Sequence, residues 1–318
     1  MIKYIVLILV FFTSLYAQKL VEPEYVYSIS SGLVTDVLSK DAKLYAATDV
    51  GNVEIFDTKS KELINTISLD KIKDFMGDEV NSKIFSLDML HKKLLILSQD
   101  TGGYSRVHIF SDGKLTSIIS KDDRLNIIKA KFINDTTIVI ALISNDIISF
   151  DINTKKKNWT TQASMSKFSS FALNNSRDLV AIADESGEVH LLSTKDGSKT
   201  KTLSGQNVDN IFSIAFRGDV VLTGGQDRRA GVYNVKTGRG YHKSSNFFVY
   251  GVGLSPSGDI GAYSSDLKND VTLFHTKTRE PIAKYKSNKA IVNSIYFINE
   301  KEFFINSASK TIGYYRVK

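Results

Sequence analysis

Five histidines are the residues of this chain best suited by type to metal binding or proton transfer. They are His91, His108, His190, His242 and His275. No two of them have a spacing that would place both on one strand or helix as metal ligands. The chain also has no cysteine that would complete such a site. We therefore expect structural or surface histidines and no metal centre.

Other residue types with catalytic potential do not form a complete motif either. Gly224 and Gly225 have no following helix that would hold a phosphate, and no G-x-S-x-G elbow occurs. Asp266, Asn269 and Asp270 offer oxygen ligands without the spacing of a calcium loop. The sequence thus predicts no catalytic residue and no cofactor.

A pair of arginines, Arg228 and Arg229, lies in a predicted turn and is suited to recognising carboxylates. A guanidinium group forms two parallel hydrogen bonds with a carboxylate and is costly to bury without one. A partner protein is one source of that carboxylate. The alternative is an acid of this chain, such as Asp227, Asp184 or Glu185.

A recurring phrase predicts the elements that carry these residues. Three of its copies are V-E-I-F-D-T-K at Val53–Lys59, V-H-L-L-S-T-K at Val189–Lys195 and V-T-L-F-H-T-K at Val271–Lys277. The aromatic or Leu anchors of the seven copies are Phe56, Phe110, Phe150, Leu192, Tyr233, Phe274 and Tyr315. The steps between these anchors are 54, 40, 42, 41, 41 and 41 residues. A period of about 40–45 residues is typical of a four-stranded propeller blade.

The two ends of the chain predict how the ring closes. After Ala290 only three strands remain, at residues 291–297, 302–306 and 311–317. Near the other end, the alternating run Glu24–Ile29 has no repeat of its own. Pairing that run with the last sheet would cover two open sheet edges. We expect an all-β protein, a seven-bladed β-propeller of four-stranded antiparallel blades whose last blade is closed by the N-terminal strand.

One insertion, Asp70–Ser82, breaks the period and accounts for the long first step. It carries Phe75 and Met76, which either pin the loop by burial or form an exposed apolar tip for binding. In a propeller, this connection and the turn with the arginines emerge on the same face. The candidate partner-binding residues are Asp74, Phe75, Met76, Asp78, Glu79, Gln226, Arg228 and Arg229.

The first residues have the layout of a secretory signal peptide, with Lys3, the apolar run Ile5–Phe12 and a small residue at Ala17. An uncleaved anchor is the alternative, but the run is shorter than the ~20 residues that span a bilayer. We expect cleavage near Ala17, a periplasmic location without a stable membrane anchor, and one propeller domain over residues 18–318. Nucleic acid is not expected as a partner of an exported protein.

The formal net charge of +7 is concentrated in the turns that follow the anchors, for example at Lys59, Lys195 and Lys236. Such turns favour Lys for solubility, which is the simpler interpretation. A basic rim that meets an acidic partner is the other interpretation.

The stretch Leu203–Gly238 resembles a blade of the WD40-type propeller family. Asp227 matches the turn aspartate of that family and Thr223 its hydroxyl. Gln206 stands where the family has His, and Tyr233 where it has Trp. We therefore expect the family's buried polar set to be absent and the blades to depend on apolar packing.

A narrower resemblance is to the propeller-type accessory proteins, the L proteins, found alongside periplasmic nitrate reductases. It rests on the segments Ile72–Asp88, Ala183–Gly187, Gly225–Ala230 and Gly253–Gly258. The resemblance implies a non-catalytic protein that supports assembly, maturation or electron supply of the reductase, with reductase subunits or maturation factors as partners. The alternatives are a propeller enzyme or cofactor carrier, which needs polar groups converging in the central channel, and an envelope-assembly propeller.

Overall fold

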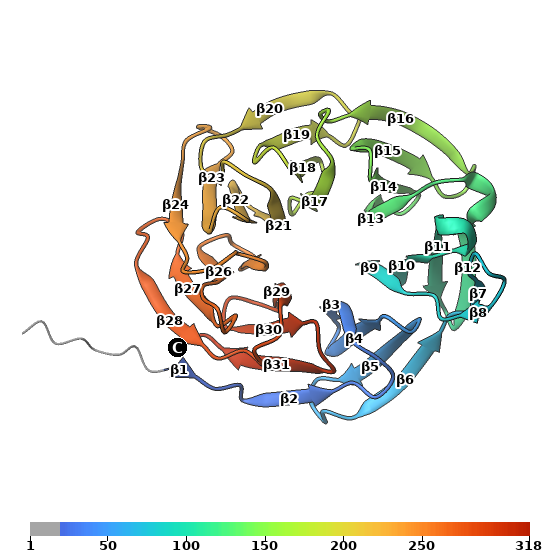
Figure 1. The fold of residues 1–318 in the computed structure, drawn as a ribbon, viewed down its shortest axis with the longest axis horizontal. Coiled ribbons are helices and arrows are strands. Elements are labelled where there is room, and N and C mark those ends of the chain that lie inside the picture. The colour runs from blue at the N-terminus through green and yellow to red at the C-terminus, as the bar shows by residue number, and fades with distance from the viewer. Residues whose placement is uncertain (1–19) are drawn as a thin grey trace, which may run out of the picture.

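The computed structural model describes residues 20–318, so the expected signal segment, residues 1–17, lies outside the described part of the chain. Seven antiparallel sheets are arranged as blades around a central channel (Figure 1). Within each blade we call the strands a to d from the channel outward. The predicted seven-bladed β-propeller is confirmed.

The strands of the first four blades follow one another along the chain. Blade 1 contains β3 (Val34–Lys40), β4 (Lys43–Thr48), β5 (Asn52–Asp57) and β6 (Leu63–Ser68). Blade 2 contains β9 (Ile84–Leu90), β10 (Lys93–Gln99), β11 (Ser105–Ser111) and β12 (Lys114–Ile119). Blade 3 contains β13 (Ile127–Asn134), β14 (Thr137–Leu142), β15 (Asp146–Asp151) and β16 (Lys156–Gln162). Blade 4 contains β17 (Phe168–Leu173), β18 (Leu179–Asp184), β19 (Val189–Ser193) and β20 (Lys199–Leu203).

The remaining blades include the two strands near the N-terminus. Blade 5 contains β21 (Ile211–Arg217), β22 (Val220–Gly225), β23 (Arg229–Asn234) and β24 (Gly240–Ser244). Blade 6 contains β25 (Val252–Leu254), β26 (Ile260–Ser264), β27 (Val271–His275), β28 (Pro281–Tyr285) and β1 (Leu20–Val21). Blade 7 contains β29 (Val292–Phe297), β30 (Glu302–Ser307), β31 (Thr311–Arg316) and β2 (Tyr25–Ser28).

The ring closes as the sequence predicts. Strand β2 pairs antiparallel with β31, from Tyr25 opposite Tyr314 to Ser28 opposite Thr311. The preceding strand β1 adds a second link that the sequence did not predict. It pairs in parallel with β28 as a fifth strand of blade 6. Residues near the N-terminus therefore hold blades 6 and 7 together.

The core consists of seven apolar clusters, and each fills the interface between two neighbouring blades. The repeated anchor residues explain this arrangement, because every anchor packs against the preceding blade. Phe56 of blade 1, for example, lies in the cluster that contains Tyr27 and Phe304 of blade 7. Tyr233 of blade 5 lies in the cluster shared with blade 4. Because neighbouring repeats bury each other's apolar faces, the phrase must recur once per blade.

Two blades also contain a buried polar set, which corrects the expectation that it is absent. In blade 5, Thr223 Oγ1 donates to Asn207 Oδ1 at 2.5 Å, and Asn207 Nδ2 donates to Asp227 Oδ1 at 3.0 Å. The family's His is thus replaced by Asn207, one residue after Gln206. Tyr233 still joins the set, because its hydroxyl accepts a hydrogen bond from the Gln206 backbone N–H.

Blade 4 has a set of its own around Asp184, which is fully buried. Its carboxylate accepts hydrogen bonds from Ser164 Oγ at 2.5 Å and Asn145 Nδ2 at 3.1 Å, and His190 Nε2 lies 3.3 Å away. Burial would raise the pKa of this carboxyl, but His190, Ser164 and Ser186 outweigh it and hold the pKa below its usual range. Asp184 therefore ties the turn of blade 4 to the preceding connection.

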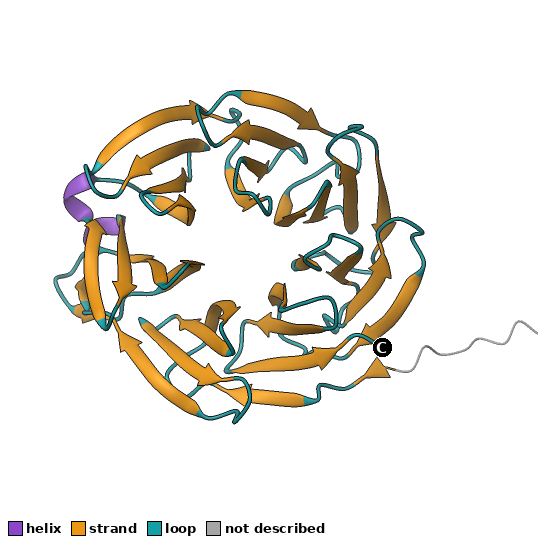
Figure 2. Ribbon diagram, turned by 180° about the vertical axis from the view of Figure 1, so that it is seen from behind, coloured by secondary structure: helices purple, strands orange, loops and turns teal. Residues whose placement is uncertain are grey.

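Strands dominate the described residues, and the helical content there consists of two short 3-10 turns, η1 (Thr101–Gly103) and η2 (Lys121–Asp123) (Figure 2). No helix in residues 20–318 has the length and apolar character that a membrane crossing requires. Antiparallel hairpins place the a–b and c–d turns on one side of the ring, which we call the a–b face. The b–c turns and d–a connections form the opposite b–c face.

Candidate functional site

The insertion forms a small hairpin on the b–c face. Strands β7 (Ile72–Lys73) and β8 (Glu79–Val80) pair antiparallel, and Ile72 is buried at the base. Asp74 shapes the tip, because its Oδ1 accepts hydrogen bonds from the backbone N–H groups of Met76 and Asp78, each at 2.9 Å. Gly77 supplies the positive φ of 90° that the tight turn needs.

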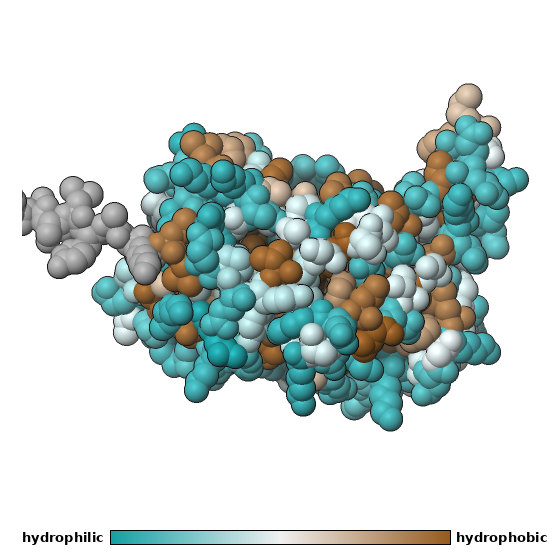
Figure 3. Space-filling view, turned by 90° about the horizontal axis from the view of Figure 1, so that it is seen from below, coloured by the Kyte–Doolittle hydropathy of each residue, from teal (hydrophilic) through white to brown (hydrophobic). Residues whose placement is uncertain are grey.

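The base of the hairpin is attached to blade 2. Lys73 donates its backbone N–H to Thr101 Oγ1 at 3.2 Å. Ser82 Oγ donates to the Gln99 carbonyl at 2.6 Å, and an Arg106 guanidinium nitrogen donates to the Asp70 carbonyl. The tip is therefore held out from the ring by its own turn and by a fixed base. In an edge-on view, a segment projects beyond the ring at the right, which is the side where Figure 1 labels β7 and β8 (Figure 3).

The two apolar residues at this tip do not pin the loop by burial. Phe75 is 87% exposed and Met76 is 85% exposed. Of the two interpretations of the insertion, the exposed apolar tip is the one that the structure favours. Asp78 and Glu79 beside them are exposed as well, whereas Asp74 is half-buried and serves the turn.

The two arginines of blade 5 differ in their surroundings. Arg229 is half-buried, with Nε 4.0 Å from Asp227 Oδ2 and Nη1 donating to the Gln206 carbonyl at 3.4 Å. This is the intramolecular pairing considered as an alternative. Arg228 is exposed and forms no ion pair with any residue in the described part of the chain. Arg228 is therefore the member of the pair that remains accessible to a partner.

The hairpin and the arginine turn share the b–c face, but the ring separates them. The hairpin lies between blades 1 and 2, and the arginine turn joins β22 to β23 of blade 5, on the opposite side of the ring (Figure 1). The predicted partner-binding residues therefore form two patches.

Exposed apolar residues distinguish the two faces. Besides the hairpin tip, the most exposed large apolar side chains are Met165, Val208 and Leu267, at 90%, 65% and 71%. All lie in d–a connections or b–c turns. In residues 20–318, no exposed large apolar side chain lies in an a–b or c–d turn. The predicted lysine-rich turns lie on this second face, and Lys236 and Lys277 pair there with Asp219 and Asp259.

The histidines and the calcium candidates have ordinary structural surroundings. Burial, together with Arg106, lowers the pKa of His108 to about 4, so its ring is neutral near pH 7. Asp266 pairs with Lys284, and Asp270 accepts a backbone hydrogen bond from Ser287. Within residues 20–318 there is no group of three His, Asp or Glu side chains that could hold a metal ion.

The central channel contains a polar cluster that the sequence interpretation did not identify. The channel has a volume of about 560 Å³. The third residue of strand a lines it in six blades, at Asp36, Ser86, Lys129, Ser170, Ser213 and Ser294. The fifth residue of the same strands also lines it, at Leu38, Asp88, Lys131, Ala172, Ala215 and Tyr296. Because alternate residues of a strand share one face, these two positions form two successive layers.

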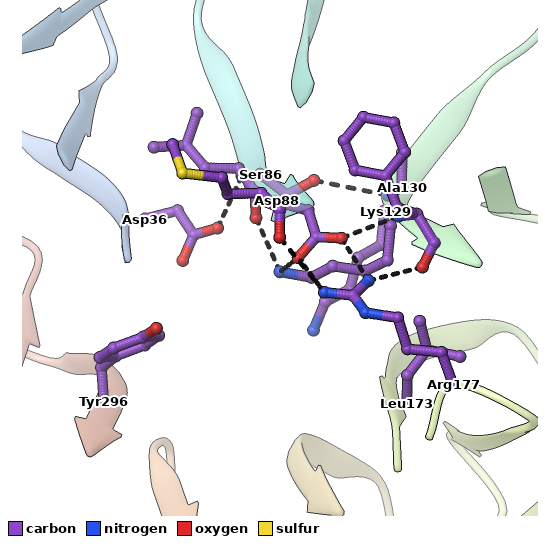
Figure 4. Close-up of polar contacts among 12 residues, drawn as sticks. Asp36, Ser86, Asp88, Lys129, Ala130, Leu173, Arg177 and Tyr296 are labelled. Atoms are coloured by element: carbon purple, nitrogen blue, oxygen red, sulfur yellow. Dashed lines mark hydrogen bonds and ion pairs between the residues drawn. The ribbon is translucent and has the colours of Figure 1, made fainter. Parts of the chain in front are cut away.

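An ion pair crosses one end of this channel (Figure 4). Arg177, in the a–b turn of blade 4, places Nη1 2.7 Å from Asp88 Oδ2 of blade 2. The same guanidinium donates to the Phe132 carbonyl of blade 3 at 2.5 Å. Asp88 Oδ2 also accepts the Phe132 backbone N–H at 2.8 Å, and Lys131 Nζ lies 3.9 Å from Oδ1. Blades 2, 3 and 4 are thus joined through one carboxylate.

The other carboxylate of the channel, that of Asp36, accepts a hydrogen bond on each of its oxygens. Asp36 accepts the backbone N–H groups of Val37 at 2.9 Å and Leu87 at 2.8 Å. Tyr296 lies across the channel from the ion pair, and its hydroxyl donates to the Ser39 carbonyl at 3.0 Å (Figure 4). The two acids therefore serve to join blades.

Two half-buried cations in the channel, Lys129 and Arg217, form no ion pair with a carboxylate among the described residues. Lys129 Nζ donates to Ser170 Oγ at 3.0 Å and lies over the Phe171 ring at 5.6 Å. Arg217 Nη1 donates only to backbone carbonyls, those of Phe216 at 2.8 Å and Leu173 at 3.3 Å. Burial, with a smaller contribution from Lys131, lowers the pKa of Lys129 to about 8.

A sequence signal for this cluster exists. Strand a of blades 1, 2 and 3 carries charged residues at the third or fifth position, where blades 4 and 5 have Ser and Ala. Lys129 and Lys131 stand out most, because two ammonium groups on one face of an inner strand point into one channel. Arg177 and Arg217 lie at or beyond the strand ends, so their direction could not be inferred from the pattern.

A scan against models of known protein families and a search of the curated proteins found no match to this chain.

Proposed function

We propose that this protein is a non-catalytic interaction platform that binds a partner protein on its b–c face. One observation carries the proposal: in the part of the chain that the structure describes, every strongly exposed large apolar residue in a turn or connection lies on that face, and the hairpin projects from it. Soluble proteins rarely expose several large apolar side chains on one face unless that face binds a partner. The opposite face carries Lys and Asp pairs and is suited to solvent.

The hairpin tip is the main contact in this proposal. Its turn is fixed by Asp74 and its base by blade 2, so little conformational entropy is lost when a partner covers Phe75 and Met76. A Phe side chain offers a large rigid apolar surface, and Met adapts to an uneven partner surface. Arg228, across the ring, adds a second contact that favours an acidic group on a partner wide enough to span the channel.

For the partner, the resemblance to the L proteins favours the subunits or maturation factors of a periplasmic nitrate reductase. In this proposal the protein supports assembly, maturation or electron supply of that reductase. The b–c face provides the binding surface, and no chemical step is assigned to the propeller.

The test is co-purification of the reductase with tagged protein from periplasm under native conditions. The wild-type protein should retain reductase subunits, and the double variant Phe75→Ser/Met76→Ser should lose most of them. The matched control is Leu63→Ser/Ile64→Ser, which removes two exposed apolar side chains, 47% and 48% exposed, from the outer strand β6. Failure of the wild-type protein to retain any reductase component, or equal loss with both variants, would overturn the proposal.

A further inference from the structure

The connection between blades 5 and 6, residues 245–251, carries aromatic side chains on the b–c face, on the side of the ring away from the hairpin (Figure 1). Phe247, Phe248 and Tyr250 belong to this connection, and Phe212 joins them from strand β21 of blade 5. The Phe212 and Tyr250 rings stack with centroids 5.2 Å apart, and those of Phe247 and Phe248 stack at 4.9 Å. Phe248 lies 6.2 Å from Phe212 and 6.0 Å from Tyr250, which joins the two pairs. We call these four residues the aromatic patch.

The aromatic patch is not needed to anchor the connection. Val249 is the anchor, because its side chain is fully buried in the cluster between blades 5 and 6. The Val249 backbone N–H donates to the Gly225 carbonyl at 3.1 Å, and that of Tyr250 donates to Ser264 Oγ at 3.0 Å. The four rings of the patch remain half-buried, whereas the core ring of Phe274 is fully enclosed. The patch is therefore a fixed aromatic surface that reaches solvent, and covering it costs this chain little conformational entropy.

The patch extends into the mouth of the central channel. Phe212 is the second residue of strand β21, and it lines the channel together with Phe85 and Ile128, the second residues of β9 and β13. These positions lie at the b–c end of the channel, because strand a begins there. On the outer side, Leu267 in the b–c turn of blade 6 is 71% exposed. An opening with apolar walls suits one extended segment of a partner, whose side chain can enter it.

The turns on either side of the connection carry positive charge without a partner. Arg228 of blade 5 and Lys268 of blade 6 lie in the two b–c turns whose carbonyl groups accept the backbone N–H groups of Ser245 and Asn246. Both charged side chains are exposed, and neither forms an ion pair in the part of the chain that the structure describes. Two cations therefore flank the patch and are accessible to the acids of a partner.

The acids of the same turns are engaged within the chain. Asp227 accepts hydrogen bonds on both of its oxygens. Asp266 pairs with Lys284, and Asp270 is 4% exposed and accepts a backbone N–H. Asp209, in the preceding connection, is exposed, but its backbone lies against the b–c turn of blade 4. The surroundings of the patch therefore favour an occupant with negative charge.

We propose that the aromatic patch is the docking site for an acidic segment of the partner protein that carries at least one large apolar side chain. The apolar side chain covers the rings of Phe212 and Phe248 at the channel mouth, and carboxylates beside it lie against Arg228 and Lys268. An aromatic side chain is favoured, because paired rings contribute more than the area they bury. This inference rests on the proposed function only in that the b–c face binds a protein. It depends neither on the hairpin nor on the identity of the partner.

Selection from a library of random dodecapeptides displayed on phage tests the proposal, with the full chain as the immobilised target. We expect the selected peptides to carry a net negative charge and at least one aromatic or large aliphatic residue. Synthetic copies should bind with one peptide per chain in calorimetric titrations, and their affinity should fall as the salt concentration rises. Failure to enrich any peptide, or enrichment of neutral or basic peptides, would overturn the proposal.

Variants test whether the peptide lies on the patch. Phe248→Ser should weaken binding about tenfold or more, as for an aromatic residue central to a contact. Lys268→Glu should weaken it about fivefold, because an attraction is replaced by a repulsion at an exposed site. The matched controls Phe75→Ser and Lys195→Glu alter the hairpin tip and a c–d turn and should bind like the wild type. Lys268 is exposed, so its variant tests the site even if Phe248→Ser folds poorly, and binding equal to that of the controls would overturn the proposal.

The results also separate this inference from the proposed function. Acidic peptides that bind the patch while no reductase co-purifies would support the patch and reject the reductase as the partner. Co-purification of the reductase without selection of any acidic peptide would overturn the patch alone. A dimer in sedimentation experiments that Phe248→Ser dissociates would assign the patch to a second copy of the chain, which would also overturn the proposal.

Discussion

Arg177 Nη1 lies 2.7 Å from Asp88 Oδ2, although the two residues are 89 positions apart and belong to blades 4 and 2. The contact bypasses the neighbouring-blade packing that otherwise holds the ring together. It is reinforced by the Phe132 carbonyl, which accepts from Arg177, and by the Phe132 N–H, which donates to Asp88. Three blades therefore depend on one guanidinium.

Replacing Arg177 by Ala should lower the free energy of unfolding by about 2–4 kcal/mol, because the variant leaves a buried carboxylate without its main partner. Urea unfolding followed by circular dichroism measures this loss. The control Arg239→Ala removes an exposed arginine of a c–d turn and should change stability by less than about 0.5 kcal/mol. A loss no larger than that of the control would show that the ion pair contributes nothing to the ring.

Closure by the N-terminal strand makes Tyr27 a core residue. Its side chain is 1% exposed and packs edge-on against Phe56 and Phe304, with ring centroids 5.4 Å and 5.9 Å away. Tyr27→Ala should therefore cost about 3–5 kcal/mol in unfolding free energy, as for other large buried aromatic residues. Tyr25, in the same strand, is 38% exposed, so Tyr25→Ala should cost much less. Equal effects of the two changes in urea titrations would contradict closure through β2.

Asp74 should control the order of the hairpin tip but not the stability of the ring. Asp74→Ala removes the acceptor of the Met76 and Asp78 amides, so both should exchange their hydrogens faster. The melting temperature should stay within about 1 °C of the wild type, because the blades are unaffected. Partner binding should weaken, since an unfixed tip loses entropy on binding. Unchanged exchange at both amides would exclude this role of Asp74.

Lys129 gives the folded protein a distinct dependence on pH. The folded-state pKa of about 8 lies below the ordinary value of 10.5, so between these values the unfolded chain binds more protons than the folded one. This contribution therefore makes the protein more stable as pH rises from 8 to 10.5. The charged groups that act on Lys129 are Lys131, which lowers its pKa further, and Asp36 and Asp88, which raise it.

Lys129→Met should remove that contribution and raise the melting temperature at pH 7. The measurement is the melting temperature of both proteins from pH 7 to 10.5. The difference should be largest at pH 7 and should shrink as pH rises. A variant that is less stable than the wild type at pH 7 would contradict a net cost of burying the Lys129 ammonium in the channel.

Asn207 should stabilise blade 5 through its buried polar set. Asn207→Ala removes one buried hydrogen bond from Thr223 Oγ1 and one from Asp227, so the unfolding free energy should fall by about 1–3 kcal/mol. Gln226→Ala is the control, because Gln226 lies exposed in the turn of the same blade. Chemical unfolding of both variants measures the difference, and equal stability of the two would contradict the role of Asn207.

The sequence by itself determined the architecture. Each anchor, from Phe56 to Tyr315, buries its side chain against the preceding blade, so the period of the anchors sets the number and size of the blades. The same pattern predicted the closing strand, because Glu24–Ile29 has the alternation of a strand and no repeat of its own. Apolar periodicity is a local property, so it can be recognised in the sequence without knowledge of any distance in the structure.

The sequence interpretation was wrong about the polar sets because a hydrogen bond needs a donor at the right place, whatever its residue type. Asn207 Nδ2 is such a donor to Asp227 and Ser164 Oγ is such a donor to Asp184, although neither donor belongs to the family phrase. The exposure of Phe75 and Met76 also needed the structure, since an apolar pair in a loop has the same composition whether it is buried or not.

Only the tertiary structure decided which charged residues meet. Asp88, Lys129, Arg177 and Arg217 lie in four successive repeats, and which of them meet depends on the radius of the ring and on the direction of two turns. Neither quantity follows from the spacing of residues along one strand. The ring brings residues that are tens of positions apart in the sequence close together. Whether a charged side chain there pairs with an acid or has no such partner depends on distances in space.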